Sequence, residues 1–201
     1  MGNKAVKTPI GMVSSYFFPF ASESASGHPT YKEKVDMGCA VKGYLSVSTA
    51  TADIYGDDAL QVSIELFVSG QMEIETTLSD LEVNAKLFGH DYAEGVETSN
   101  ADDAAPNGGY AFIQRLHDKK RDTIVYRPTF LRKTAAVQSS EKQEADTRKE
   151  GLDPKMNAVT LKVMKDNTGD WRVRKDCDTL AAAEAYIDEL AALSTSGEQA
   201  T

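Results

Sequence analysis

Two adjacent carboxylates, Asp57 and Asp58, are the residues whose types and spacing most readily suggest chemistry in this sequence. They follow Tyr55 and Gly56 in the stretch IYGDDALQVSI, residues 54–64, which has apolar residues on both sides. A Tyr-Gly-Asp-Asp turn between strands is typical of the catalytic hairpin of template-directed viral polymerases. In such a hairpin the carboxylates hold the metal ions of nucleotidyl transfer, so the pair raises the question of a two-metal site.

Size and charge argue against a polymerase. The chain has 201 residues, the length of one domain with appendages, whereas a polymerase of this kind needs palm, fingers and thumb. Asp and Glu number 31 against 22 Lys and Arg, which gives a net charge of −9. Such a surface repels template and primer, because nucleic-acid affinity depends on Lys and Arg against phosphate. A two-metal site also needs another carboxylate from a neighbouring strand. Because acidic residues are plentiful, the sequence alone does not exclude a third carboxylate at that place.

The sequence holds no stronger catalytic or metal-binding motif. It lacks a Gly-rich phosphate loop and a nucleophile elbow, and its three histidines stand alone. Cys39 and Cys177 lack metal-ligand spacing, so reduced thiols are the simpler interpretation. Asp102 and Asp103 lie in an acidic stretch without the regular ligand spacing of a calcium loop. The sequence therefore predicts a protein that is not an enzyme and that holds no metal ion or cofactor.

Most of the elements that would position these residues are strands. LQVSIELFVSG, residues 60–70, alternates from Leu60 to Val68, which predicts a half-buried strand directly after the Tyr-Gly-Asp-Asp turn. Turn-like segments of hairpin length separate other apolar runs. Further strands are expected at 16–20, 30–49, 109–116, 122–130, 157–164 and 171–177.

Two segments have helical periodicity instead. A short internal helix is expected at about 80–88, where a capping box, Ser79-Asp-Leu-Glu, marks the start and Gly89 marks the end. An Ala-rich segment predicts a C-terminal helix at about 179–193, followed by a flexible tail, residues 194–201.

The internal helix is apolar on two sides. Leu81, Ala85 and Phe88 form one stripe at helical spacing, and we predict that they belong to the structural core. Val83 and Leu87 lie on roughly the opposite side. A helix of this kind is either clamped between core elements or offers its second side to a partner, and we expect Val83 and Leu87 to become buried only on assembly.

These elements predict a mainly β, α+β fold built from two packed antiparallel sheets or a partly open β-barrel. Residues 1–177 would form the β domain, with a polar acidic stretch at 93–109 and a charged loop at about 132–155. Edge strands, long loops and an acidic surface favour an assembly protein. Copies of such a domain that pair head to tail can close into a ring.

The order of the segments carries a more specific signal. An aromatic first strand, YFFPF, is followed by a stretch that ends in an aromatic-x-Asp-Asp turn, then by a short helix that ends in Leu-Phe-Gly-His. An acidic loop and the aromatic hairpin GYAFIQRLHDKKRDTIVYRPTF come next. Over residues 12–177 this order resembles the major tail protein, the tail-tube subunit, of long-tailed, non-contractile bacteriophages and prophages of Gram-positive bacteria. The C-terminal helix is an extension outside that pattern.

The resemblance implies the phage tail-tube fold, which type VI secretion tube proteins share. It implies a virion protein that self-assembles into hexameric rings, stacked into a tube that delivers DNA into the host. Assembly would take place in the host cytoplasm with tape-measure, tail-terminator and baseplate or distal tail proteins. DNA would pass through the lumen without specific binding, and no membrane is involved. In this setting the candidate subunit or ring contacts are Tyr55, Asp57, Asp58, Val83 and Leu87.

Three alternatives remain at the level of sequence. A secretion-type or pyocin-type tube subunit belongs to the same broad class. A monomeric β-sandwich that binds a ligand would stay a single species at every concentration. A metal-dependent enzyme would use Asp57 and Asp58 as ligands.

In the tail-tube interpretation, the charged loop at about 132–155 is expected to stack one ring on the next.

Overall fold

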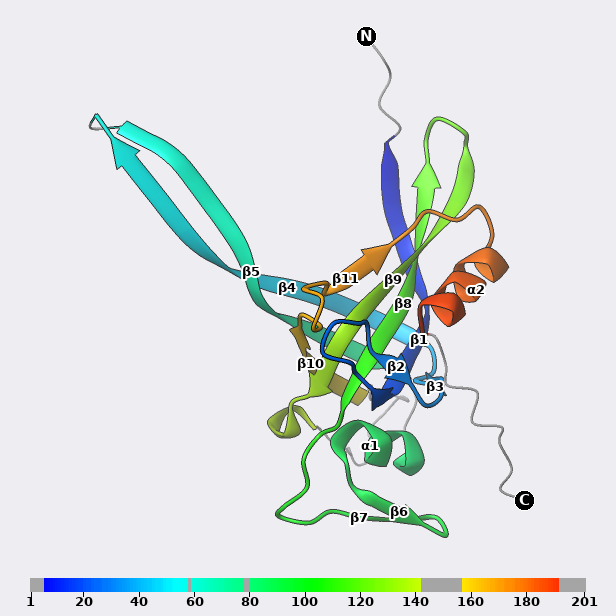
Figure 1. Cartoon of the computed structure of the whole chain (residues 1–201). Helices are drawn as coiled ribbons and strands as arrows, with labels where there is room; N and C mark the ends of the chain where they lie inside the picture. Colours follow the sequence, from blue (N-terminus) through cyan, green and yellow to red (C-terminus); the bar gives the residue numbers. More distant parts are fainter. Residues whose placement is uncertain (1–5, 58, 78–79, 142–156, 192–201) are drawn as a thin grey trace, which may run out of the picture.

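The computed structural model describes residues 6–57, 59–77, 80–141 and 157–191 (Figure 1). One large antiparallel sheet has the strand order β2-β1-β8-β9-β10-β5-β4, with β3 beside β1 and β11 beside β9. Its strands are β1 (Lys7–Ser22), β2 (Thr30–Tyr31), β3 (Val35–Asp36), β4 (Ala40–Gly56), β5 (Ala59–Thr76), β8 (Asn107–Asp118), β9 (Thr123–Ala136), β10 (Asn157–Met164) and β11 (Arg172–Arg174). A small second sheet pairs β6 (Asp91–Ala93) with β7 (Val96–Thr98). Two helices, α1 (Leu81–Phe88) and α2 (Leu180–Ala191), complete the predicted α+β fold, which is confirmed.

The large sheet bends over itself without closing into a barrel. Gly43 of β4 lies so close to Met12 of β1 that an added Cβ would meet the methionine sulfur at 3.1 Å. Large apolar side chains fill the space between these two ends of the sheet. They include Phe17, Met72, Ile74, Phe88, Tyr110, Phe112, Leu131, Leu161 and Val163. The order still ends at β2 and β4, so the barrel stays open along one side.

The C-terminal helix covers the opposite face of β8 and β9 (Figure 1). Ala183, Ile187 and Ala191 follow one another at four-residue intervals, which places them on one side of α2, and all three are buried. They pack against Ile113 and Phe130 of the sheet. The predicted helix is therefore confirmed over Leu180–Ala191, and it packs on its own subunit.

The two sides of α1 are occupied differently from the prediction. Ala85 and Phe88 are buried in the core, as predicted, but Leu81 is 48% exposed, so its assignment to the core is wrong. Leu81 is the first residue of the helix and extends past the core. Leu87 is 4% exposed and Val83 packs against the same core, so the expectation that these two await a partner is wrong for the free subunit. The helix is clamped between core elements, which is why it is apolar on two sides.

The ends of α1 are fixed by local hydrogen bonds. Asp80 is the N-cap, and its carboxylate Oδ1 accepts the backbone N–H of Glu82 at 2.8 Å. The predicted cap residue, Ser79, lies outside the described residues. Gly89 ends the helix with a φ of 79°, as predicted, and an added Cβ there would lie 2.3 Å from the carbonyl oxygen of Ala104.

Both polar stretches contain regular structure. Residues 91–98 form the β6–β7 hairpin, and His90 Nδ1 lies 2.8 Å from Glu97 Oε1 with both side chains largely buried. The loop expected at about 132–155 is wrong in its first part, because β9 continues to Ala136 and a 3-10 turn follows at Gln138–Ser140. Residues 142–156 and the predicted tail, 194–201, lie outside the described residues.

The packing of α1 predicts a large difference between two leucine-to-alanine substitutions in one helix. Leu87→Ala should lower the free energy of unfolding by about 3 kcal/mol, because it removes buried methyl groups and leaves a cavity. Leu81→Ala, at the exposed end, should change it by less than about 0.5 kcal/mol. Urea unfolding of the dilute protein measures both. Equal losses would contradict the orientation of the helix.

A charged cluster joins the start of β1 to the segment before α2. Asp176 accepts hydrogen bonds from Arg127, at 2.6 and 3.1 Å, and from Lys7 at 2.5 Å. The hydrogen bonds from Arg127 lower the pKa of Asp176 to about 2, despite its partial burial. Because this folded-state pKa lies below the ordinary value, the stabilisation is present above about pH 4 and is lost as the pH falls towards about 2.

Asp176→Asn should therefore reduce stability by about 1 kcal/mol at pH 7, since the pair is partly exposed and screened by solvent. The difference from wild type should shrink as the pH falls through about 2, where Asp176 is half protonated in the folded state, and should vanish only below that pH. Thermal unfolding across pH measures this. The matched control is Asp178→Asn, whose carboxylate pairs with Arg121 but is 78% exposed. A loss at Asp176 that does not depend on pH would contradict the account.

Candidate assembly surface on the β4–β5 arm

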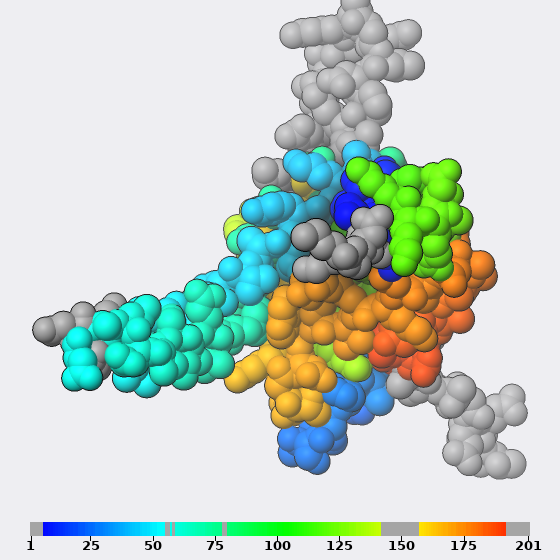
Figure 2. Space-filling model, turned by 90° about the horizontal axis from the view of Figure 1, so that it is seen from above, coloured from blue at the N-terminus to red at the C-terminus, as the bar shows by residue number. Residues whose placement is uncertain are grey.

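The longest hairpin of the chain leaves the body of the molecule as a two-stranded ribbon (Figure 1). β10 pairs with β5 over Gly70–Thr76 only. Among the described residues, β5 beyond Gly70 has β4 as its one neighbouring strand, and β4 is the last strand of the sheet. We call residues 47–56 and 59–69 the arm. Figure 2 shows it standing out from the rest of the protein, in cyan.

The strand register separates the arm into an apolar and a polar face. Residues that lie opposite each other in an antiparallel pair project to the same side. Ala50, Ala52 and Ile54 lie opposite Leu66, Ile64 and Val62, and these six residues form the apolar face. Thr51 and Asp53 lie opposite Glu65 and Ser63, and these four form the polar face.

No described element covers the apolar face. Ile54 is 55% exposed and Leu66 is 64% exposed, and Val62 and Ile64 are exposed as well. On the polar face, the Ser63 hydroxyl donates a hydrogen bond of 2.6 Å to Asp53. The ribbon is thus amphipathic, with its apolar side turned to solvent. Contiguous exposed apolar surface of this kind is typical of protein–protein contact sites.

A β-bulge explains why these apolar residues are outside. Thr49 pairs with Phe67 while Ser48 pairs with Ser69, so Val68 is an extra residue in β5. The bulge reverses the alternation: Phe67 packs against the core, whereas Val68 is 56% exposed. The predicted half-buried strand from Leu60 to Val68 does form, but its expected burial is wrong, because beyond the bulge Val62, Ile64 and Leu66 face away from the core.

Stacked rings hold the root of the arm against the body. Phe67 and Trp171 stack with ring centroids 4.5 Å apart and an angle of 4° between planes. The guanidinium carbon of Arg172 lies 4.3 Å from the Trp171 ring centroid, which makes a cation–π contact. These contacts fix the direction of the arm at its base, where β5 leaves the sheet.

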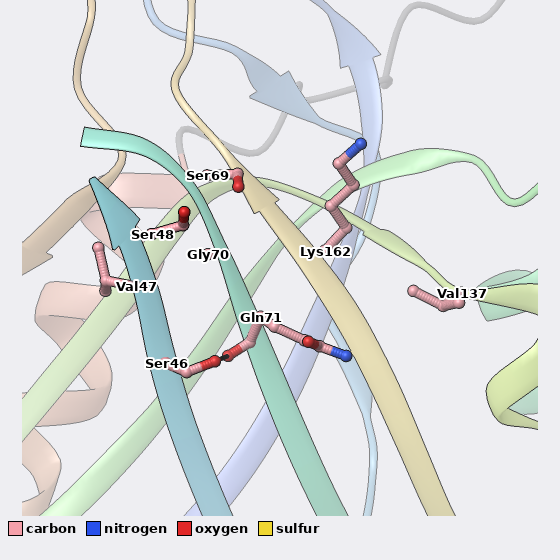
Figure 3. Close-up of a pocket in the computed structure, with 8 residues that line it drawn as sticks. All are labelled: Ser46, Val47, Ser48, Ser69, Gly70, Gln71, Val137 and Lys162. Atoms are coloured by element: carbon pink, nitrogen blue, oxygen red, sulfur yellow. Dashed lines mark hydrogen bonds between the residues drawn. The ribbon is translucent and has the colours of Figure 1, made fainter. Parts of the chain in front are cut away.

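A hollow of about 350 Å³ lies beside this root (Figure 3). Figure 3 shows β4, β5 and β10 side by side at this place. The described lining residues are Ser46, Val47, Ser48, Ser69, Gly70, Gln71, Val137 and Lys162. Hydroxyl, amide and amino groups can hydrogen-bond a partner chain, and this lining contains no carboxylate, imidazole or thiol for catalysis.

Gly56 pairs with Ala59 at the tip of the arm, so the predicted turn between two long strands is confirmed. Asp57 is exposed and has a φ of 51°, in the left-handed region. Asp58 and the side chain of Tyr55 lie outside the described residues. The arrangement does not bring Val83 and Leu87 to the tip, because both belong to the core around α1.

Within the described ranges, no group of three or more His, Cys, Asp or Glu side chains is placed to hold a metal ion. Cys39 and Cys177 are both free. In the same ranges, no helix has the length and apolar character needed to cross a bilayer. The arm is a candidate contact surface that the sequence patterns do not indicate. Its signal is strand length, since β5 has 18 residues and typical strands have about 5–6.

No protein-family model matches this chain, and no curated protein matches it. The class of the molecule therefore follows from its own geometry, an open α+β domain with a projecting amphipathic β-ribbon.

The exposure of the arm predicts that its apolar face contributes little to the stability of the free subunit. Leu66→Ser should change the free energy of unfolding by less than about 0.5 kcal/mol. Phe67→Ala, one residue further along, should lower it by about 2–3 kcal/mol, because it removes the stack on Trp171. Urea unfolding at low protein concentration tests the pair. A loss at Leu66 as large as that at Phe67 would mean that the apolar face is covered within the subunit.

Proposed function

We propose that this protein is a self-assembling structural subunit whose arm packs against a neighbouring copy, and that the assembly is a bacteriophage tail tube. The observation that carries the proposal is the uncovered apolar face of the arm, with Ile54 and Leu66 more than half exposed. Burial of apolar side chains is the main driving force of protein association. An arm that stays in water would forgo that gain.

A second copy of the chain suits the arm for two reasons. The ribbon has backbone groups along its outer edges that no described strand pairs with, and another strand can add there. A contact between an arm and a different surface of the next copy is head-to-tail. Contacts of this type repeat until they close a ring or extend as a helix. Both outcomes are steps in building a tube.

The tail-tube form of the proposal rests on the order of segments in the sequence and on charge. In this proposal six copies form a ring, rings stack into a tube, and the genome passes through the lumen during delivery. A net charge of −9 suits a conduit that must not grip phosphate, and it keeps free subunits apart before assembly. Tape-measure, tail-terminator and baseplate or distal tail proteins would be the partners, in the virion and earlier in the host cytoplasm.

The two other non-enzymatic functions relate differently to the arm. A secretion-type or pyocin-type tube subunit would use it in the same way. A monomeric ligand-binding module would leave the arm without a role. The arm therefore favours assembly over a monomeric module.

Electron microscopy of three proteins tests the proposal. Wild type should form rings or tubes of uniform width, with light scattering that rises with protein concentration. Ile64→Lys, which places a charge on the apolar face, should abolish them, because burial of an unpaired charge is strongly unfavourable. Thr51→Lys adds the same charge to the polar face, opposite Glu65, and should assemble like wild type.

The opposite results are also informative. Assembly by Ile64→Lys as efficient as that of wild type would show that the arm does not mediate the contact. A wild-type protein that remains a monomer at every concentration, with and without preformed tube ends as seeds, would contradict self-assembly.

A further inference from the structure

A second pocket, of about 430 Å³, lies at the open end of the core between β1, β4, β8 and β11. Part of its wall is apolar, with Met12, Leu45, Met72 and Phe112. Its polar lining residues include Gln114, Thr129, Arg172 and Arg174. We call these four residues the arginine pocket.

Sheet register brings the polar members to one side. Arg174 lies opposite Thr129 in the β11–β9 pair, and Thr129 lies opposite Phe112 in the β9–β8 pair. Arg172 is two residues from Arg174 on the same strand, so both arginines project to the same face. Strands from distant parts of the chain thus deliver two guanidinium groups and one hydroxyl to one place.

The two arginines carry charge that no described carboxylate neutralises. Arg121 and Arg127 pair with aspartates, but in the part of the chain that the structure describes neither Arg172 nor Arg174 has an ion pair. Burial, together with the neighbouring Arg174 charge, lowers the pKa of Arg172. Lys42, also on the pocket wall, already pairs with Glu75 at 3.2 Å. Two unpaired guanidinium groups side by side are unfavourable unless an anion joins them.

Thr129 supplies an independent sign of a missing partner. The residue is 2% exposed, and its Oγ1 is buried without a hydrogen-bond partner. A buried hydroxyl of this kind is rare and destabilising, because it has lost water and gained nothing in exchange. Thr129 lines the pocket, and its hydroxyl can donate to a ligand oxygen there once the side chain rotates about χ1 towards the pocket.

We propose that the arginine pocket binds an anionic oxygen group, a carboxylate or a phosphate. Arg172 and Arg174 supply the positive charge, and the Thr129 hydroxyl and the Gln114 amide donate hydrogen bonds. The apolar wall accepts a short hydrocarbon part of the ligand. Either a free small anion or a carboxylate side chain of a second copy has this chemistry. The free-anion form does not depend on the proposed assembly.

An anion bound in the pocket would also restrain the side chains at the root of the arm. Arg172 stacks on Trp171, and Trp171 stacks on Phe67. An anion that holds Arg172 therefore also holds the rings that set the direction of the arm.

The test measures the unfolding temperature of the dilute full-length protein during titration with inorganic phosphate and, separately, with hexanoate, at constant ionic strength. Binding to the folded state should raise this temperature along a saturating curve. The double variant Arg172→Gln/Arg174→Gln should lose the response. The matched control, Lys119→Gln/Lys120→Gln, removes two exposed charges from the β8–β9 turn and should keep it.

Thr129→Val provides a second variant, with a different expected signature. It removes the unpaired hydroxyl at nearly constant size, so the anion-free protein should unfold at the wild-type temperature or above it. Its affinity for the anion should fall about tenfold, because one hydrogen bond to a charged group is lost.

A further series, without added anion, distinguishes the two sources. This series uses the Ile64→Lys protein, in which assembly through the arm is removed. If the carboxylate comes from a second copy, its unfolding temperature should still rise with protein concentration, and adding the double arginine substitution should abolish that rise. The proposal is overturned if neither anion shifts the wild type and concentration does not shift the Ile64→Lys protein, or if the double arginine substitution leaves these responses unchanged. Because the anion titration uses dilute protein, a failure of assembly leaves its result intact.

Discussion

The bulge at Val68 is the constraint on which the two halves of the longest hairpin depend. On the body side of it, Met72 and Ile74 face the core and help to join the two ends of the bent sheet. On the far side, the same alternation of apolar residues faces solvent. One extra residue in one strand thus converts a continuation of the core into an exposed apolar surface. The fold and the proposed assembly surface have a common origin in this single irregularity.

Three features meet where the arm leaves the body. Phe67 and Trp171 stack there, Arg172 extends from this stack to the pocket, and β10 stops pairing with β5 at Gly70. A ribbon with few contacts along its length has a direction set by its base. Any group that binds at the base acts on the whole arm, which gives an anion in the arginine pocket a route to the assembly surface.

Local sequence patterns were sufficient for most of the strands of the large sheet, for both helices and for part of the core, but not for the β6–β7 hairpin. Alternation predicted the strands, the Ala-rich repeat predicted α2, and helical spacing placed Ala85 and Phe88 in the core. The same spacing failed for Leu81 and Leu87, because a helix of eight residues is buried by what surrounds it and not by one stripe.

Local patterns do not predict the apolar face of the arm or the arginine pocket. The run from Leu60 to Val68 alternates except at Phe67, and one apolar residue out of phase does not by itself show where the strand changes face. The arginine pocket depends on the pairing of β11 with β9, which lie far apart in the chain. Thr129 becomes notable only when its burial and missing partner are known. Long-range register, which no local pattern encodes, created both sites.

Hydrogen–deuterium exchange across β5 tests the central claim, that the arm is open in the free subunit and covered in the assembly. Residues 59–69 belong to the arm, and residues 70–76 of the same strand are flanked by β10 and serve as the internal control. In dilute protein the amides of 59–69 should exchange much faster than those of 70–76. As light scattering rises with concentration, 59–69 should become protected while 70–76 change little. Assemblies in which 59–69 exchange as fast as in the free subunit would contradict the account.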